Sequence, residues 1–220
     1  MIEPPLQTAI PVVGGGWFPV RRVYCVGRNY ADHAREMGAD PDREPPFFFS
    51  KPRDALTGEA TAPYPPATAD LHYEVELVLA LHHGGAHLSP AEAIACIYGG
   101  AVGVDLTRRD LQTEAKKAGR PWDAAKRFDH SAPIGHLKPG LPAGSGAITL
   151  TVNGQTRQAG DLAEMIWSPA ETLVHLSGLF ELMPGDLIYT GTPAGVGPIV
   201  QGDHVEARID GLPAHSFTLV

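Results

Sequence analysis

Leu71-His72-Tyr73-Glu74-Val75-Glu76-Leu77-Val78-Leu79-Ala80 is the stretch around which this chain is organised. It is rich in aliphatic and β-branched residues, which is typical of a β-strand, and successive side chains of a strand point to opposite faces. We predict that Val75, Leu77 and Leu79 face the core. Glu74 and Glu76 then share the other face, where neighbouring carboxylates repel each other unless water screens them or a cation neutralises them. A solvated outer face is the alternative, because glutamate is usually exposed.

Length and composition indicate one domain with many turns. A chain of 220 residues can bury a sizeable core. We expect residues 1–20 to form an irregular lead-in or a short edge strand, and residues 21–220 to form a single domain. The 25 glycines and 21 prolines favour turns and short strands over long helices. The predicted class is therefore a mixed, β-rich α+β fold.

The composition also argues against several classes of protein. No basic region followed by an apolar run opens the chain, and no apolar stretch is long enough to span a membrane. Cys25 and Cys96 form no metal-ligand or redox motif, which is typical of a protein in a reducing cytoplasm. The net charge of −8 argues against a nucleic-acid partner.

A cationic segment nevertheless lies between Asp105 and Arg127. It holds seven of the 17 lysines and arginines, against four acidic residues. Such a patch in an acidic protein predicts a small anionic ligand, although a solvated helix face has the same pattern.

Short elements separated by turns are predicted along the rest of the chain. Strands are expected at residues 22–27, 47–49, 101–104, 185–190, 203–209 and 216–220, and helices at 31–37, 108–118 and 169–180. Asn29 or Asp32 is expected to cap the first helix, which should stop at Gly38 before a turn-rich loop at 40–46. Ser89 and Glu92 have capping-box spacing at the start of a further helix, and Asn153-Gly154 suits a hairpin turn.

Glu74, Glu76 and Asp105 form a candidate metal site if the fold brings them together. Three carboxylates without a cysteine or an obvious histidine ligand make an all-oxygen site, which suits Mg²⁺ or Mn²⁺ and leaves positions for water and a chelating substrate. Zinc would more often recruit histidine or cysteine. The alternative for Asp105 is a helix N-cap after the apolar run at 101–104.

Three further features could carry chemistry. His33 and Glu36 lie on one helical face, as a general base and the carboxylate that orients it, or else as a surface ion pair. Lys126 could place a cation beside a developing oxyanion, or else be an ordinary surface lysine. The glycine-rich loop at residues 191–197 offers backbone amides and the Thr192 hydroxyl to an anion, or else is a tight structural turn. This loop lacks the Lys-Ser/Thr ending of a P-loop.

Six separated stretches follow one another in a recognisable order. They are Val26-Gly27-Arg28-Asn29-Tyr30-Ala31-Asp32-His33, Lys51-Pro52, Leu71-His72-Tyr73-Glu74-Val75-Glu76-Leu77, Gly103-Val104-Asp105-Leu106-Thr107-Arg108-Arg109-Asp110-Leu111-Gln112, Pro121-Trp122-Asp123-Ala124-Ala125-Lys126-Arg127-Phe128-Asp129 and Thr190-Gly191-Thr192-Pro193-Ala194-Gly195-Val196-Gly197. Together they resemble the fumarylacetoacetate hydrolase superfamily, in its short single-domain branch of acylpyruvate hydrolases. Residues 31–46 and 108–112 are most similar to bacterial fumarylpyruvate hydrolases of the gentisate route of aromatic degradation.

This resemblance implies a fold and a set of site residues. The fold would be a β-roll of mixed sheets with short helices, usually a homodimer, with residues 21–220 as the catalytic domain. Glu74, Glu76 and Asp105 would bind Mg²⁺ or Mn²⁺. The other implied roles are His33 and Glu36 as the water-activating pair on a mobile lid, Lys126 as an electrophilic partner, and Arg28, Lys51, Gln112 and Thr192 as residues that line the substrate pocket.

The resemblance also implies a reaction, the metal-dependent hydrolysis of a carbon–carbon bond in an acylpyruvate. Fumarylpyruvate, a small anionic 2-oxo acid, would give fumarate and pyruvate, and Arg28, Lys51 or Arg109 would bind its far carboxylate. The alternatives are oxaloacetate decarboxylation and the isomerisation or decarboxylation of longer unsaturated 2-oxo acids. A non-catalytic dicarboxylate sensor with the same fold is a further alternative.

Overall fold

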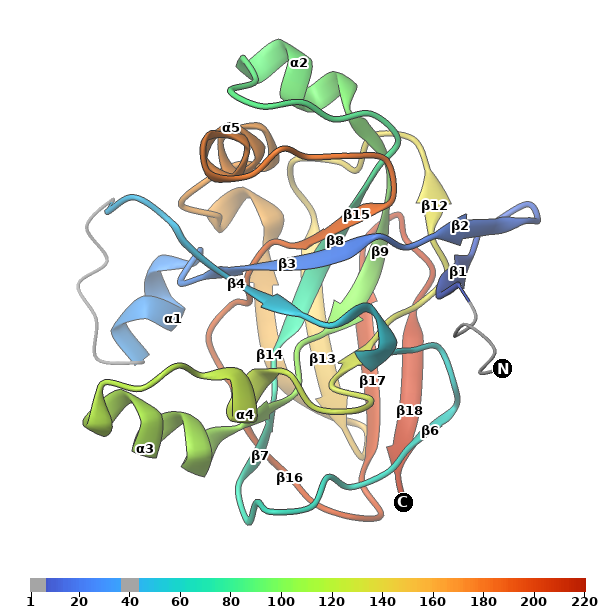
Figure 1. The fold of residues 1–220 in the computed structure, drawn as a ribbon. Helices are drawn as coiled ribbons and strands as arrows, with labels where there is room; N and C mark the ends of the chain where they lie inside the picture. Colours follow the sequence, from blue (N-terminus) through green and yellow to red (C-terminus); the bar gives the residue numbers. More distant parts are fainter. Residues whose placement is uncertain (1–6, 37–43) are drawn as a thin grey trace, which may run out of the picture.

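Many short strands and a few short helices make up the molecule (Figure 1), for which a computed structural model describes residues 7–36 and 44–220. The strands are β1 (Ala9–Pro11), β2 (Trp17–Pro19), β3 (Arg22–Gly27), β4 (Phe47–Lys51), β5 (Leu56–Thr57), β6 (Thr61–Ala62), β7 (Leu71–Tyr73), β8 (Val75–Leu81), β9 (Ile97–Val104), β10 (Thr107–Arg108), β11 (Ala132–Pro133), β12 (Lys138–Pro139), β13 (Ala147–Val152), β14 (Gln155–Asp161), β15 (Asp186–Tyr189), β16 (Gly197–Ile199), β17 (His204–Ile209) and β18 (His215–Leu219). The helices are α1 (Ala31–Glu36), α2 (Pro90–Ala95), α3 (Arg109–Ala118), α4 (Asp123–Lys126) and α5 (Pro169–Leu179), with 3-10 turns at Arg53–Ala55 and Leu162–Glu164. The predicted helix stop at Gly38 and most of the predicted loop at 40–46 lie outside the described residues.

Two mixed sheets form the body of the fold. The larger has six strands in the order β12-β9-β8-β15-β3-β4, in which only β3 and β15 are parallel neighbours. The second has five strands in the order β14-β13-β17-β18-β6, with β18 and β6 parallel. Side chains from both sheets enclose the main hydrophobic core. The predicted mixed, β-rich α+β class is therefore confirmed.

The helices lie around the sheets rather than between them. In Figure 1, α2 and α5 lie at one end of the molecule, and α3 and α4 lie toward the opposite end. Within residues 7–36 and 44–220, no helix is long and apolar enough to cross a membrane.

The predicted strand at residues 71–80 is interrupted at Glu74. β7 pairs with β10 and β16 in a separate three-stranded sheet, whereas β8 lies between β9 and β15 in the six-stranded sheet. Alternate side chains of β8 pack into two different hydrophobic clusters, one on each face. Glu74 and Glu76 are consequently only 6% and 2% exposed, so the solvated alternative for them is wrong.

The pairing of β8 with β9 places Asp105 beside Glu74. Glu76 lies opposite Gly103, and the Asp105 amide donates a 2.8 Å hydrogen bond to the Glu74 carbonyl. A Cβ atom at Gly103 would lie 2.6 Å from the ring of Tyr189. The close approach of β9 to Tyr189 therefore depends on glycine at this position. Asp105 follows two residues later, at the end of the sheet.

Most of the local signals are confirmed. Ser89 and Glu92 form a complete capping box at the start of α2. Asn153 and Gly154 both have positive φ, 52° and 75°, as a two-residue type I′ turn between β13 and β14 requires. α3 covers the predicted polar helix and ends at Gly119, whose φ is 62°.

Asn29 has a different role from the predicted helix cap. It is fully buried, and its amide nitrogen donates to the carbonyls of Trp167 and Thr190 while its amide oxygen accepts from the Trp167 amide. These contacts join the segment before α1 to the segment before α5 and to the residue that follows β15. The cap prediction for Asn29 is wrong, because its side chain bonds to these distant backbone groups and lies two residues before the first residue of α1.

Candidate active site

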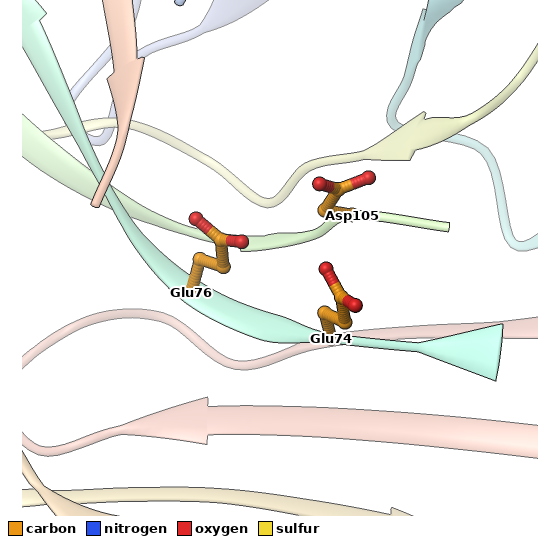
Figure 2. Close-up of side chains that lie close together, drawn as sticks. All are labelled: Glu74, Glu76 and Asp105. Carbon is orange, nitrogen blue, oxygen red and sulfur yellow. The ribbon is translucent and has the colours of Figure 1, made fainter. Parts of the chain in front are cut away.

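Three acidic side chains converge at the end of two adjacent strands. Glu74 precedes β8, Glu76 lies within it, and Asp105 follows β9. Figure 2 shows the three side chains close together, and ligand oxygens of all three lie within 4.8 Å of one another. Asp105 is fully buried and α3 begins only at Arg109, so the N-cap alternative for Asp105 is wrong.

Glu74 is neutralised by two cations. Arg109 Nη2 donates to Glu74 Oε1 at 2.5 Å, and Lys126 Nζ donates to Glu74 Oε2 at 2.8 Å. Burial by itself raises the pKa of the Glu74 carboxyl, but the Lys126 ammonium and the Arg109 guanidinium outweigh burial and hold this pKa well below its ordinary value. Glu74 is therefore ionised at neutral pH.

Glu76 has no comparable compensation. Its Oε2 accepts a 2.6 Å hydrogen bond from the Gly191 amide, and no cationic side chain among the described residues forms an ion pair with it. Burial, Asp105 and Glu74 raise the pKa of the Glu76 carboxyl well above its ordinary value. A buried carboxylate beside two others fits a divalent cation, which supplies the missing charge and accepts oxygen ligands. This donor set favours Mg²⁺ or Mn²⁺ over zinc.

Lys126, at the end of α4, is held between two of the acids. Its ammonium donates to Glu74 Oε2 and Asp105 Oδ2, both at 2.8 Å, and to Thr107 Oγ1 at 2.6 Å. Burial by itself lowers the pKa of Lys126, but Asp105 and Glu74 outweigh burial and raise it. The surface-lysine alternative is wrong, because Lys126 is only 3% exposed. All three of its N–H donors are used, so one of them must be released before Lys126 can contact a substrate.

Lys51, at the end of β4, is paired with one of the acids. Its Nζ is 2.9 Å from Asp105 Oδ1 and donates to the carbonyls of Leu106 and Lys126. Its ammonium is buried and occupied by these contacts, and the expectation that Lys51 lines the substrate pocket stays a prediction. Lys51 pairs with Asp105 Oδ1, whereas Lys126 pairs with Asp105 Oδ2.

His33, on α1, is buried at the same site. Its Nδ1 is 3.4 Å from Glu36 Oε2, and the Gly195 amide donates to both Glu36 oxygens at 3.2 and 3.3 Å. Burial lowers the pKa of His33, and Glu74 and Glu36 reverse this effect only in part. His33 is therefore neutral at pH 7 and can accept a proton. The surface ion-pair alternative is wrong, because His33 is only 7% exposed.

The side chains enclose a small space, which we call the inner cavity, of about 40 Å³. It is lined by Val26, Gly27, Arg28, His33, Phe47, Phe49, Glu74, Glu76, Arg109, Gln112, Lys116, Trp122, Lys126, Gly191 and Thr192. A second space of about 560 Å³, the outer cavity, shares with it Arg28, Phe47, Phe49, Trp122 and Lys126. A ligand whose anionic group lies in the inner cavity can therefore extend into the outer cavity, where aromatic side chains surround it.

One face of α3 lines the inner cavity. Arg109, Gln112 and Lys116 are spaced i, i+3 and i+7, which places them on one side of a helix. Arg109 Nη1 donates to Gln112 Oε1 at 2.7 Å, so the two side chains are fixed together. Lys116 is absent from the predicted site, although its spacing from the other two is a signal in the sequence that indicates it.

Comparison with known proteins identifies relatives of this chain. A family model described as fumarylacetoacetate (FAA) hydrolase C-terminal matches residues 22–220. A fumarylpyruvate hydrolase from Ralstonia sp is 44% identical over 188 residues, which are 83% of this chain and 98% of the relative. The mitochondrial oxaloacetate tautomerase FAHD1 of Mus musculus is 40% identical over 205 residues, which are 91% of this chain and 92% of the relative.

A solved structure has nearly the same fold. It is the crystal structure of fumarylpyruvate hydrolase from Pseudomonas aeruginosa in complex with Mn²⁺ and pyruvate, with 49% sequence identity. The match has a TM-score of 0.97 and covers 100% of this chain and 98% of the other. The predicted β-roll of mixed sheets with short helices is thereby confirmed.

Proposed function

Because this chain belongs to the fumarylacetoacetate hydrolase family, we propose that it hydrolyses the carbon–carbon bond of an acylpyruvate with Mg²⁺ or Mn²⁺ as cofactor. The substrate of this proposal is fumarylpyruvate, and the products are fumarate and pyruvate. The relatives that support it are the fumarylpyruvate hydrolases of Ralstonia sp and Pseudomonas aeruginosa, the latter with Mn²⁺ and pyruvate in its complex.

One observation carries the proposal of hydrolysis rather than decarboxylation. His33, a buried neutral imidazole with Glu36 beside it, lines the same inner cavity as Glu74 and Glu76. A general base that faces the metal site is what the activation of water requires. Decarboxylation needs no attacking water and gives no reason for this pair.

The reaction gives His33, Glu36 and Lys126 defined roles. A bound Mg²⁺ or Mn²⁺ supplies Lewis acidity at the 2-oxo acid end of the substrate. His33, oriented by Glu36, removes a proton from a water that attacks the distal carbonyl carbon. A carbon–oxygen bond forms, the carbon–carbon bond breaks, and its electron pair leaves as the enolate of pyruvate. The Lys126 ammonium faces this developing charge, and protonation of the enolate carbon gives pyruvate.

Oxaloacetate tautomerisation is a second candidate, favoured by the tautomerase of Mus musculus at 40% identity. The two functions are separated by assaying the purified protein with fumarylpyruvate and with oxaloacetate, each with Mg²⁺, with Mn²⁺ and with a chelator. We expect metal-dependent cleavage of fumarylpyruvate to pyruvate and fumarate, with much slower turnover of oxaloacetate. Faster tautomerisation or decarboxylation of oxaloacetate would transfer the function to those reactions and leave the metal site unchanged.

The far carboxylate of fumarylpyruvate requires a cation at the junction of the two cavities. Of the cations predicted for it, Lys51 and Arg109 are already paired with Asp105 and Glu74. Arg28 remains, with its guanidinium 5.5 Å from the Phe47 ring centre and a strained φ of 60°. Lys116 is a second candidate, with its Nζ 5.1 Å from the Trp122 ring centre.

Arg28 and Lys116 are free to bind an anion. Among the described residues no carboxylate pairs with either, and both line the inner cavity. Aromatic faces hold these two cations in place without neutralising them. We therefore propose that they bind the acyl carboxylate.

Replacing Lys116 with methionine is expected to raise the KM for fumarylpyruvate about three- to tenfold, because one partly solvated charge pair is lost. Its effect on an acylpyruvate with an uncharged acyl group is expected to be less than about twofold. Steady-state kinetics on both substrates measure this difference. Lys117→Met is the matched control, since Lys117 is exposed on the same helix and does not line the inner cavity. Equal losses on both substrates would remove Lys116 from carboxylate recognition.

The homodimeric assembly, the gentisate route and the cytoplasmic location are finer parts of this proposal. They are supported by the sequence and its resemblance to this family. Light scattering coupled to size-exclusion chromatography tests the first of them, and a monomer would contradict it.

A further inference from the structure

Gln158 is a fully buried polar residue that connects the candidate metal site to the glycine-rich loop. Its Oε1 accepts a 3.0 Å hydrogen bond from the amide of Val75, the residue between two of the acids. Its Nε2 donates to the Pro193 carbonyl and to Thr192 Oγ1, both at 2.8 Å. One side chain from the five-stranded sheet thus joins β8 to the loop.

The partners determine the orientation of this amide. The Val75 amide can only donate, so it must face Gln158 Oε1, and the Pro193 carbonyl can only accept, so it must face Nε2. The second N–H of Nε2 then points to Thr192, whose hydroxyl oxygen acts as the acceptor. No described residue accepts a hydrogen bond from that hydroxyl in return. Because Thr192 lines the inner cavity, its own O–H is available to a ligand there.

A β-bulge brings Gln158 into this position. Leu150 pairs with Gln158 but Thr151 pairs with Thr156, so Arg157 is an extra residue in β14. Bulges re-aim side chains and are common next to active sites. Gln158 is the one buried residue of β14.

The glycine-rich loop lies directly on this bulge. A Cβ atom at Gly195 would be 2.2 Å from the Arg157 carbonyl oxygen, and Gly195 has a φ of +95°. The loop therefore follows β14 closely only because glycine stands there. The bulge and the Gln158 amide together fix the position of Thr192 at the inner cavity that Glu74 and Glu76 also line.

We infer that Gln158 is a positioning residue, which commits the Thr192 hydroxyl to donating a hydrogen bond to the carboxylate of the bound 2-oxo acid. This inference rests on the proposed function only in its ligand class, a 2-oxo acid. The Gln158 amide occupies one lone pair of the Thr192 oxygen and so restricts the rotation of the hydroxyl, and a carboxylate can only accept, so the O–H of Thr192 is the group presented to an anion. The arrangement explains why a polar side chain is buried in β14.

The test uses Gln158→Glu, which keeps the shape and the acceptor for Val75 but offers a carboxylate oxygen to Thr192. The Thr192 hydroxyl is then expected to donate to that carboxylate instead of to the ligand. We expect the affinity for pyruvate in the presence of Mn²⁺, measured by isothermal titration calorimetry, to fall about ten- to hundredfold. Thr192→Val is expected to cause a similar loss, and Thr192→Ser a much smaller one.

The double variant separates positioning from a general structural role. If Gln158 acts through the Thr192 hydroxyl, Gln158→Glu combined with Thr192→Val should be no weaker than Thr192→Val alone. The thermal shift caused by Mn²⁺ alone should stay as in the wild type. Additive losses, or an equal loss of Mn²⁺ binding, would show that Gln158 only supports the fold and would overturn the inference.

Two controls complete the experiment. Gln155→Glu changes an exposed glutamine of the same strand and should leave pyruvate affinity unaltered. If Gln158→Glu does not fold, Gln158→Met replaces it in the test, since it adds no charge. The expected loss of pyruvate affinity is smaller, because methionine leaves the Thr192 hydroxyl without a partner and does not accept a hydrogen bond from it as a carboxylate would. Wild-type protein that binds no 2-oxo acid would refute the proposed function, whereas wild-type binding with unchanged affinity in both Gln158 variants would refute the positioning role alone.

Discussion

Glu76→Gln is expected to reduce turnover by more than about 100-fold, the loss that changing even an outer partner of a metal ligand can cause. The amide keeps the acceptor for the Gly191 amide but offers no charge to a divalent cation. Thermal unfolding should show that metal binding is lost as well. Mn²⁺ must raise the melting temperature of the wild-type protein, because it binds the native state, and should no longer raise that of the variant.

The same substitution is not expected to lower the melting temperature of the metal-free protein. Burial, Asp105 and Glu74 raise the pKa of Glu76 above its ordinary value, so its ionised form costs folding free energy at neutral pH. Without metal, Glu76→Gln should therefore melt no lower than the wild type. Glu114→Gln, at an exposed position of α3, is the control for the loss of one carboxylate. A variant that Mn²⁺ still stabilises as it does the wild type would contradict the assignment of Glu76 as a ligand.

His33→Ala is expected to lower kcat for acylpyruvate hydrolysis by about 10²- to 10⁴-fold, the range for loss of a positioned general base. Decarboxylation of oxaloacetate at the same metal site should fall far less, since it needs no activated water. Both rates are measured on one preparation with Mn²⁺ present, and the Mn²⁺-dependent thermal shift checks that the metal still binds. Equal retention of both activities would remove His33 from water activation.

The pH dependence of the wild-type enzyme follows from the burial of His33. A general base acts in its neutral form, and burial lowers the pKa of His33 below its ordinary value of 6.5. The acid limb of kcat/KM should therefore lie below pH 6.5. Glu36 raises this pKa, so Glu36→Gln should move the limb to still lower pH while it lowers kcat. A limb that moves to higher pH in Glu36→Gln would contradict the contact between the two residues.

The local elements and the acids of the site could be predicted from the sequence. Capping residues such as Ser89 and the turn pair Asn153-Gly154 act on backbone within a few residues, so the adjacent sequence is enough to predict their effect. The alternation of glutamates around Val75 likewise placed two carboxylates on one face of a strand. What the alternation could not show is that both faces of β8 are covered, which turns an ordinary acidic face into a buried one.

The sequence by itself determined which chemical groups this protein has: three carboxylates for a hard divalent cation, a histidine with a carboxylate three residues on, and a glycine-rich loop. Only the tertiary structure decided how those groups are paired. Lys126 reaches Glu74 across 52 residues, Gln158 reaches Val75 across 83, and the Gly191 amide reaches Glu76 across 115. Such contacts depend on sheet register, on the bulge in β14 and on the packing of two sheets, and none of these is set by neighbours along the chain. Lys51 shows the consequence, because only the fold pairs its buried ammonium with Asp105.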